Sequence, residues 1–202
     1  MMMNKTIIVV AVVLALIVFS CSKGEEAQEK ASPAAQPAQA ASIAGGGFML
    51  KAADVDFTWN IQGDKLSVKL AAPTTGWIGV GFNPTEEMKD ANFIIGFVKD
   101  GEVSVLDQFG TAKRKHKEDS ELGGTDNLSD TAGSETASST EISFTMPLKS
   151  GDAMDREILP QADQVVLLAY GNTDRLAQQH VANAKLKVNL STGSYQVLKI
   201  SE

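Results

Sequence analysis

The sequence predicts an all-β protein, an Ig-like antiparallel β-sandwich of roughly nine or ten strands. Three observations lead to this fold class. Apolar and polar residues alternate in short runs, turn-forming residues separate these runs, and no long stretch repeats apolar residues at the helical spacing. The pattern begins at about Phe48, and the remaining residues, about 155 of the 202, suit a single domain.

Individual strands follow from this alternation. In chain order it predicts strands over residues 55–59, 66–70, 93–98, 103–109, 142–146, 186–190 and 195–200. Asp100-Gly101 lies between two of them and is a strong signal for a two-residue hairpin. Residues 165–170 form a nearly continuous apolar run, which is typical of a central strand buried on both faces.

Residues 112–139 interrupt this rhythm and are predicted to form a long surface loop, the kind that is often functional or mobile. The loop starts with a basic run, Lys113-Arg-Lys-His-Lys117, which is interpreted as a solvated turn rather than a docking site. Asp126, Asn127 and Asp130 offer oxygen ligands, but the spacing of a calcium-binding loop is missing. These three side chains are therefore expected to be solvated.

The N-terminus has the features of a targeting segment. A basic residue precedes a short apolar run over residues 7–19, and Cys21 follows directly. This arrangement resembles the lipobox of bacterial lipoproteins and predicts a signal peptide over residues 1–20 and lipid on Cys21; the alternative is an uncleaved anchor helix. Both place the domain outside the cytoplasm, anchored to a bacterial membrane. Because Ser22 and not an aspartate follows the cysteine, a Gram-negative cell would sort it to the outer membrane.

Residues 21–47 are rich in Ala, Gln, Glu, Pro and Gly and contain almost no large apolar side chain. Such a composition cannot bury enough surface to fold, so a flexible tether is predicted between the lipid and the domain of residues 48–202. The whole chain carries a net charge of −7, and this balance argues against nucleic acid as a partner. Cys21 is the only cysteine, which excludes a disulfide within the chain and a cysteine-ligated iron–sulfur centre.

Two segments far apart in the chain combine glycine, aromatic residues and a metal-ligand side chain. The first reads Thr75-Gly76-Trp77-Ile78-Gly79-Val80-Gly81-Phe82-Asn83 and runs on to Met88. The second reads Leu168-Ala169-Tyr170-Gly171-Asn172-Thr173 and runs on to His180. A thioether and an imidazole are the axial pair that holds haem iron in electron carriers.

These segments resemble the DOMON domain family, and the resemblance spans about residues 48–190. In its haem-binding members a Gly-Trp-x-Gly-x-Gly-Phe strand is followed by a methionine, and a strand ending Ala-Tyr-Gly is followed by a histidine. The resemblance therefore implies haem b, with Met88 and His180 as the iron ligands. Since the chain has no Cys-x-x-Cys-His, the haem would be held non-covalently.

Each candidate residue also has a simpler interpretation. Taken alone, Met88 would plug the end of the sandwich and His180 would be structural or exposed. His116 is the rival ligand, although its Lys and Arg neighbours favour solvent. We expect both ligands to meet at one end of the sandwich, on opposite sides of one flat ligand. The nearest groups by sequence for the haem propionates are Lys89, Asn172 and Arg175.

Trp77, Phe82 and Tyr170 are either core residues or, next to the two ligands, residues that line the porphyrin. Gly79 and Gly81 remove side-chain bulk from one face of their strand, so that a flat ligand or another backbone can approach closely; a β-bulge is the equal alternative.

The chain contains no Gly-x-Ser-x-Gly, His-Glu-x-x-His or phosphate-loop motif. An electron carrier or a binding module is therefore expected rather than an enzyme. The preferred hypothesis is a membrane-anchored haem b protein that serves an unknown redox partner protein. The alternatives are a module that binds carbohydrate or another ligand without haem, in which exposed aromatic rings stack on the sugar, and a lipoprotein scaffold that binds a partner chain.

Overall fold

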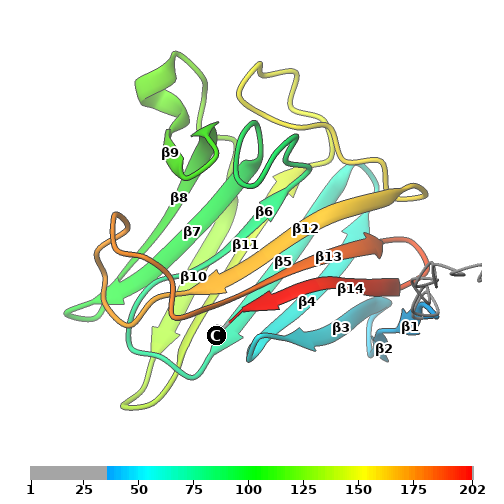
Figure 1. Cartoon of the computed structure of the whole chain (residues 1–202), viewed down its shortest axis with the longest axis horizontal. Helices are drawn as coiled ribbons and strands as arrows, with labels where there is room; N and C mark the ends of the chain where they lie inside the picture. Colours follow the sequence, from blue (N-terminus) through cyan, green and yellow to red (C-terminus); the bar gives the residue numbers. More distant parts are fainter. Residues whose placement is uncertain (1–35, 202) are drawn as a thin grey trace, which may run out of the picture. The chain divides into compact units, whose positions relative to one another are not determined.

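The computed structural model describes residues 36–201, which form fourteen strands and one 3-10 turn (Figure 1). All paired strands are antiparallel and make two sheets. In spatial order, the eight-stranded sheet contains β1 (Ala38–Gln39), β14 (Ser194–Ser201), β13 (Ala182–Asn189), β12 (Asp163–Tyr170), β6 (Ile78–Phe82), β7 (Asn92–Lys99), β8 (Glu102–Ala112) and β9 (Lys115–Glu118). The six-stranded sheet contains β10 (Ser129–Glu135), β11 (Thr140–Pro147), β5 (Lys65–Ala72), β4 (Val55–Gln62), β3 (Gly47–Ala52) and β2 (Ala41–Ile43). The predicted all-β sandwich is confirmed.

The main core lies between the two sheets and follows the period-two alternation of the strands. On β12, Val166 and Leu168 point into this core, while Leu167 and Ala169 point to the outer side of the eight-stranded sheet. The largest fully buried side chains of the core include Phe57 and Trp59, whose rings stack with centroids 4.8 Å apart. As predicted, β12 is central, between β6 and β13.

Two predicted boundaries were wrong. The sandwich starts before Phe48, because β1 pairs with β14, β2 pairs with β3, and Ala40 is buried in the core. Residues 112–139 are not one loop: they contain β9, the 3-10 turn Asp119–Leu122 and the edge strand β10. These short or polar strands have no apolar alternation, so composition alone could not reveal them. They also account for most of the difference between fourteen strands and the nine or ten predicted.

A chain that begins at Phe48 is expected to be less stable than one that begins at Gln36, by about 5 °C or more in Tm. The shorter chain loses Ala40 from the core and the contacts of the first strands with Thr192 and Gly193. Thermal unfolding of the two chains, followed by circular dichroism, measures the difference. Equal Tm values would show that these edge strands add nothing to the stability of the domain.

The predicted signal peptide, Cys21 and most of the predicted tether lie outside the described residues. Among the residues that the structure describes, we find no helix with the length and apolar character needed to cross a membrane.

Candidate functional site

A second apolar cluster covers the outer side of the eight-stranded sheet. We call it the outer-face cluster; its buried members are Trp77, Ala91, Phe93 and Ile95, and its half-buried members are Met88, Phe97, Leu167, Ala169 and Leu176. It forms because the central strands β12, β6 and β7 carry apolar or small residues on this side too. These side chains are buried or half-buried, so the cluster is a second, smaller core outside the main one, and we take this face as the candidate site.

Two glycines form the middle of this face. Gly81 pairs with Leu167 on one side and Phe93 on the other, and Gly79 pairs in the same way with Ala169 and Ile95. The register is regular on both sides of β6, so the bulge alternative is not found. A Cβ on Gly81 would overlap the ring of Phe93. The glycines therefore make room for the side chains of Phe93 and Ile95, which lie over them.

Met88 lies in the loop between β6 and β7 and packs on one end of the outer-face cluster. Its amide donates to the carbonyl of Lys113 at 3.2 Å. The same turn, which joins β8 to β9, forms ion pairs from Lys113 to Glu86 at 2.6 Å and from Arg114 to Glu87 at 3.4 Å. Lys113 and Arg114 of the basic run therefore hold the loop that carries Met88 in place.

His180 lies at the other end of the cluster, in the loop between β12 and β13. Its Nδ1 is 3.3 Å from the amide nitrogen of Asn183, which pairs with Ala169 on the outer face. Burial lowers the pKa of His180 from 6.5, and the charge of Lys199 lowers it further. The imidazole is therefore neutral near pH 7, and this is the form that binds metals.

The structure corrects the expectation that Met88 and His180 meet at one end of the sandwich. Since β12 runs antiparallel to β6, Tyr170 pairs with Ile78 at the start of β6, whereas the loop of Met88 follows Phe82 at its end. The two loops therefore lie at opposite ends of the outer-face cluster (Figure 1). Leu176 and Met88 extend over the cluster from these two ends.

Two of the predicted haem-lining residues belong to the main core instead. Phe82 and Tyr170 share the inward face of their strands with Val80 and Leu168 and pack between the sheets. The alternation that brings Gly79 and Gly81 outward necessarily turns Phe82 inward. Trp77 does lie in the outer-face cluster, where its indole nitrogen is buried without a hydrogen-bond partner.

The expectation for His116 also needs correction. This residue is half-buried on β9, hydrogen-bonds the side chain of Gln108, and lies 5.9 Å from Phe93 between ring centroids. Burial lowers its pKa from 6.5. His116 therefore borders the outer face and is not a solvated side chain.

Sequence reasoning missed Asn183 and the neighbouring cations at the His180 end. Lys185 lies next to Asn183 on the outward side of β13 and pairs with Lys199 of β14. The alternation of Lys185 with the core residues Ala184 and Leu186 was the signal that could have placed it on this face. Arg175, which was predicted from sequence proximity, is exposed.

Replacing Gly110 by alanine is expected to displace the loop of Met88. A Cβ at this position would overlap the carbonyl oxygen of Met88, and neither backbone can move without breaking the bonds between Gly110 and residues 90 and 91. We expect a loss of about 1–3 kcal/mol in the free energy of unfolding. Gly79→Ala is the control, because its nearest contact is the Ile95 side chain at 3.0 Å. Urea unfolding should show the larger loss for Gly110→Ala, and the reverse order would contradict this account.

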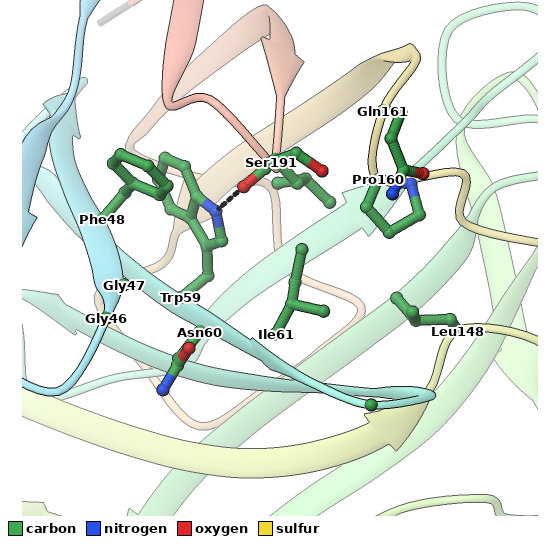
Figure 2. A pocket seen from close by; sticks show the side chains of 12 residues that line it. Gly46, Gly47, Phe48, Trp59, Asn60, Ile61, Leu148, Pro160, Gln161 and Ser191 are labelled. Carbon is green, nitrogen blue, oxygen red and sulfur yellow. Dashed lines mark hydrogen bonds between the residues drawn. The ribbon is translucent and has the colours of Figure 1, made fainter.

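A separate cavity of about 380 Å³ lies away from this face, between the end of β13 and strands β3 and β4 (Figure 2). Phe48 and Trp59 border it with ring centroids 5.6 Å apart. Trp59 is only 1% exposed, and its indole N–H donates to the carbonyl of Leu190 at 2.9 Å. An aromatic ring so completely covered has no free face on which a sugar could stack.

Comparison with known sequences shows which family this chain matches. The family model described as "DOMON domain" matches residues 51–171, a range that includes Met88 and ends before His180. The chain is also 31% identical over 116 residues to "DBH-like monooxygenase protein 1" of Mus musculus and, equally, of Homo sapiens. The aligned part covers 57% of this chain but only 18% of each of these relatives.

Two solved structures share the fold. The cytochrome b domain of pyranose dehydrogenase from Coprinopsis cinerea superposes with a TM-score of 0.51 at 13% identity, over 77% of this chain and 78% of that one. The cytochrome domain of cellobiose dehydrogenase from Myriococcum thermophilum superposes with a TM-score of 0.52 at 11% identity, over 74% and 84%. At these identities the likeness concerns the fold.

Proposed function

This chain belongs to the DOMON domain family, and we propose that it binds haem b non-covalently on the outer face of the eight-stranded sheet and transfers electrons. Met88 and His180 would hold the iron. Bound haem supplies a one-electron couple between ferrous and ferric iron. The cytochrome domains that share the fold support this choice of cofactor.

The observation that carries the proposal is an apolar face with a thioether at one end and an imidazole at the other. A flat apolar ring needs this kind of surface, and a thioether and an imidazole are side chains that would hold its iron. Gly79 and Gly81 carry no side chain, and the side chains of Phe93 and Ile95 lie over them, with Leu167 beside them. This apolar layer supports a flat apolar ligand.

The surrounding side chains would each have a definite task. Asn183 would orient the imidazole through the contact of its amide group with Nδ1, which leaves Nε2 as the nitrogen available to the iron. Lys185 and Lys199 would supply positive charge for propionate groups. With Met88 and His180 as the residues that hold it, the haem would supply electron transfer, and we expect an electron carrier rather than an enzyme.

The absorption spectrum tests this function. Protein produced with adequate haem supply should be red, show a low-spin spectrum, and change reversibly on addition of dithionite and reoxidation. Protein that remains colourless after incubation with haem would contradict the proposal. A DOMON module that binds carbohydrate or another ligand, or a scaffold for a partner chain, would then lead, and the outer-face cluster would be the surface to test.

We also propose that lipid on Cys21 anchors this domain to a bacterial membrane, on the sequence pattern alone. Two or more acyl chains retain a protein stably at a membrane, where a single chain gives marginal binding. Cys21→Ser is expected to leave the precursor unprocessed or to release the protein from membranes. Mass spectrometry and membrane fractionation measure both effects, and a variant with wild-type mass and wild-type partition would contradict the anchor.

A further inference from the structure

Three aspartates from separate segments converge between the sheets, next to the start of β7. We call Asp107, Asp119 and Asp155 the acidic cluster. They come from β8, from the 3-10 turn after β9 and from the segment between β11 and β12. One carboxylate oxygen from each lies within 4.8 Å of the others. Asp107 is 5% exposed and Asp119 is fully buried, so this is not a solvated surface patch.

Several oxygens at this place have no hydrogen-bond partner. They are both carboxylate oxygens of Asp119, Oδ1 of Asp107 and Oδ1 of Asn92. Asn92 is 1% exposed, and its amide nitrogen donates to Asp155 at 2.6 Å, so its side chain is directed into the acidic cluster. A buried polar group without a partner is costly, and such groups are rare in folded proteins. Four such oxygens close together indicate that a cation would bind among them.

The charges around the cluster give the same indication. Within residues 36–201, none of its three carboxylates takes part in an ion pair; the nearby Arg156 pairs with Asp90 instead. Asp107 and Asp119 are buried close to each other and to Asp155, and no positive side chain of the described residues balances them.

We propose that Asp107, Asp119 and Asp155, together with the side-chain oxygen of Asn92, bind one calcium ion. All four offer oxygen, which is the ligand of hard cations; zinc and copper sites in proteins rely on nitrogen and sulfur. Three carboxylates and an amide oxygen from one chain suit calcium, which takes six to eight oxygen ligands, whereas magnesium usually keeps several waters and binds through one or two carboxylates.

Other polar groups fix the frame of the site. The backbone N–H of Asn127 donates to Asp107 at 3.0 Å, and its side-chain amide donates to Asp155 at 3.2 Å. Asp152 accepts backbone N–H groups of Thr125 and Met154 at 2.6 and 2.8 Å. These contacts hold residues 125–127 next to residues 152–155 and leave both carboxylate oxygens of Asp119 without a partner.

Calcium at this site would also support the loop that carries Met88. Arg156 follows Asp155 directly, and its Nε donates to the carbonyl of Asp90 at 2.6 Å. Asn92 begins β7, immediately after the same loop. The ion would thus join β8, the 3-10 turn and the segment around Asp155 to the strand that leaves this loop.

The test uses the full-length protein without haem, so its result is independent of the proposed electron transfer. After treatment with EGTA, the protein is titrated with CaCl2 by calorimetry, and Tm is measured with EGTA, CaCl2 or MgCl2. We expect one calcium per chain and a rise in Tm of about 5–10 °C at a calcium concentration roughly 100 times Kd. Asp119→Asn should abolish this rise while Tm in EGTA stays close to that of the wild type, because asparagine has the shape of the neutral acid.

Asp64→Asn is the matched control, because Asp64 is exposed in the turn between β4 and β5, and it should keep the full calcium response. If Asp119→Asn does not fold, Asp155→Asn, at a half-buried position, gives the same readout. No calcium-dependent heat and no rise in Tm at millimolar calcium would overturn the proposal, as would a rise that persists in both cluster variants. An equal rise with MgCl2 would overturn the choice of calcium.

Discussion

His180→Ala is expected to abolish the low-spin haem spectrum, and Met88→Ala to retain haem with an open coordination position. The difference arises because imidazole is the stronger ligand, so the thioether alone cannot hold the iron. Methionine favours the reduced iron, and Met88→Ala should therefore also lower the reduction potential, on the order of 100 mV within the ~0.8 V range that axial ligands span. Absorption spectra and a redox titration measure both effects.

Met88→His provides the control for this pair. A second imidazole at the same position should restore a low-spin spectrum with a potential below that of the wild type. His116→Ala is the control for the rival ligand, since His116 lies in the same face, and it should keep the low-spin spectrum. If Met88→Ala and His180→Ala both retain the wild-type spectrum, these residues are not the ligands.

Leu167→Ala and Leu168→Ala are expected to have opposite consequences although the residues are neighbours. Leu168 is fully buried between the sheets, so its loss should lower the free energy of unfolding by about 2–5 kcal/mol. Leu167 lies on the outer face next to Gly81. Its loss should change stability little but weaken haem binding on the order of tenfold, because fewer apolar groups are covered by the ligand.

Urea unfolding of haem-free protein and titration with haem separate the two effects. Each leucine serves as the control for the other, because the chemical change is identical and only the face of β12 differs. If Leu168→Ala weakens haem binding more than Leu167→Ala does, the ligand lies between the sheets and the outer-face site is wrong.

The alternation along the chain was sufficient to predict the sandwich and the central position of β12. The same rule could have separated Gly79 and Gly81 from Phe82, since residues of odd and even number face opposite ways. The motif gives only the order of these residues in the sequence and not the direction of their side chains. Phe82 and Tyr170 were therefore assigned to the haem site, although both belong to the main core.

The rest could not be predicted because it depends on contacts between distant segments. No spacing in the sequence links Asp107 to Asp119 and Asp155, which meet only after β8, β9 and the segment after β11 have taken their places. Asn127 was expected to be solvated, yet it bonds two of these three carboxylates. The polar edge strand β10 is mostly exposed, so its pairing with β11 leaves no apolar signature.

Because the outer-face cluster lies outside the main core, the domain would fold before it binds a cofactor. The main core is closed by side chains of the two sheets and of adjoining segments, among them Ile158, so folding would not require a cofactor as a nucleus. Under the proposed function, the chain would fold first and take up haem afterwards from the solvent side. The supply of haem would then limit the yield of active protein, while the yield of folded protein would be independent of it.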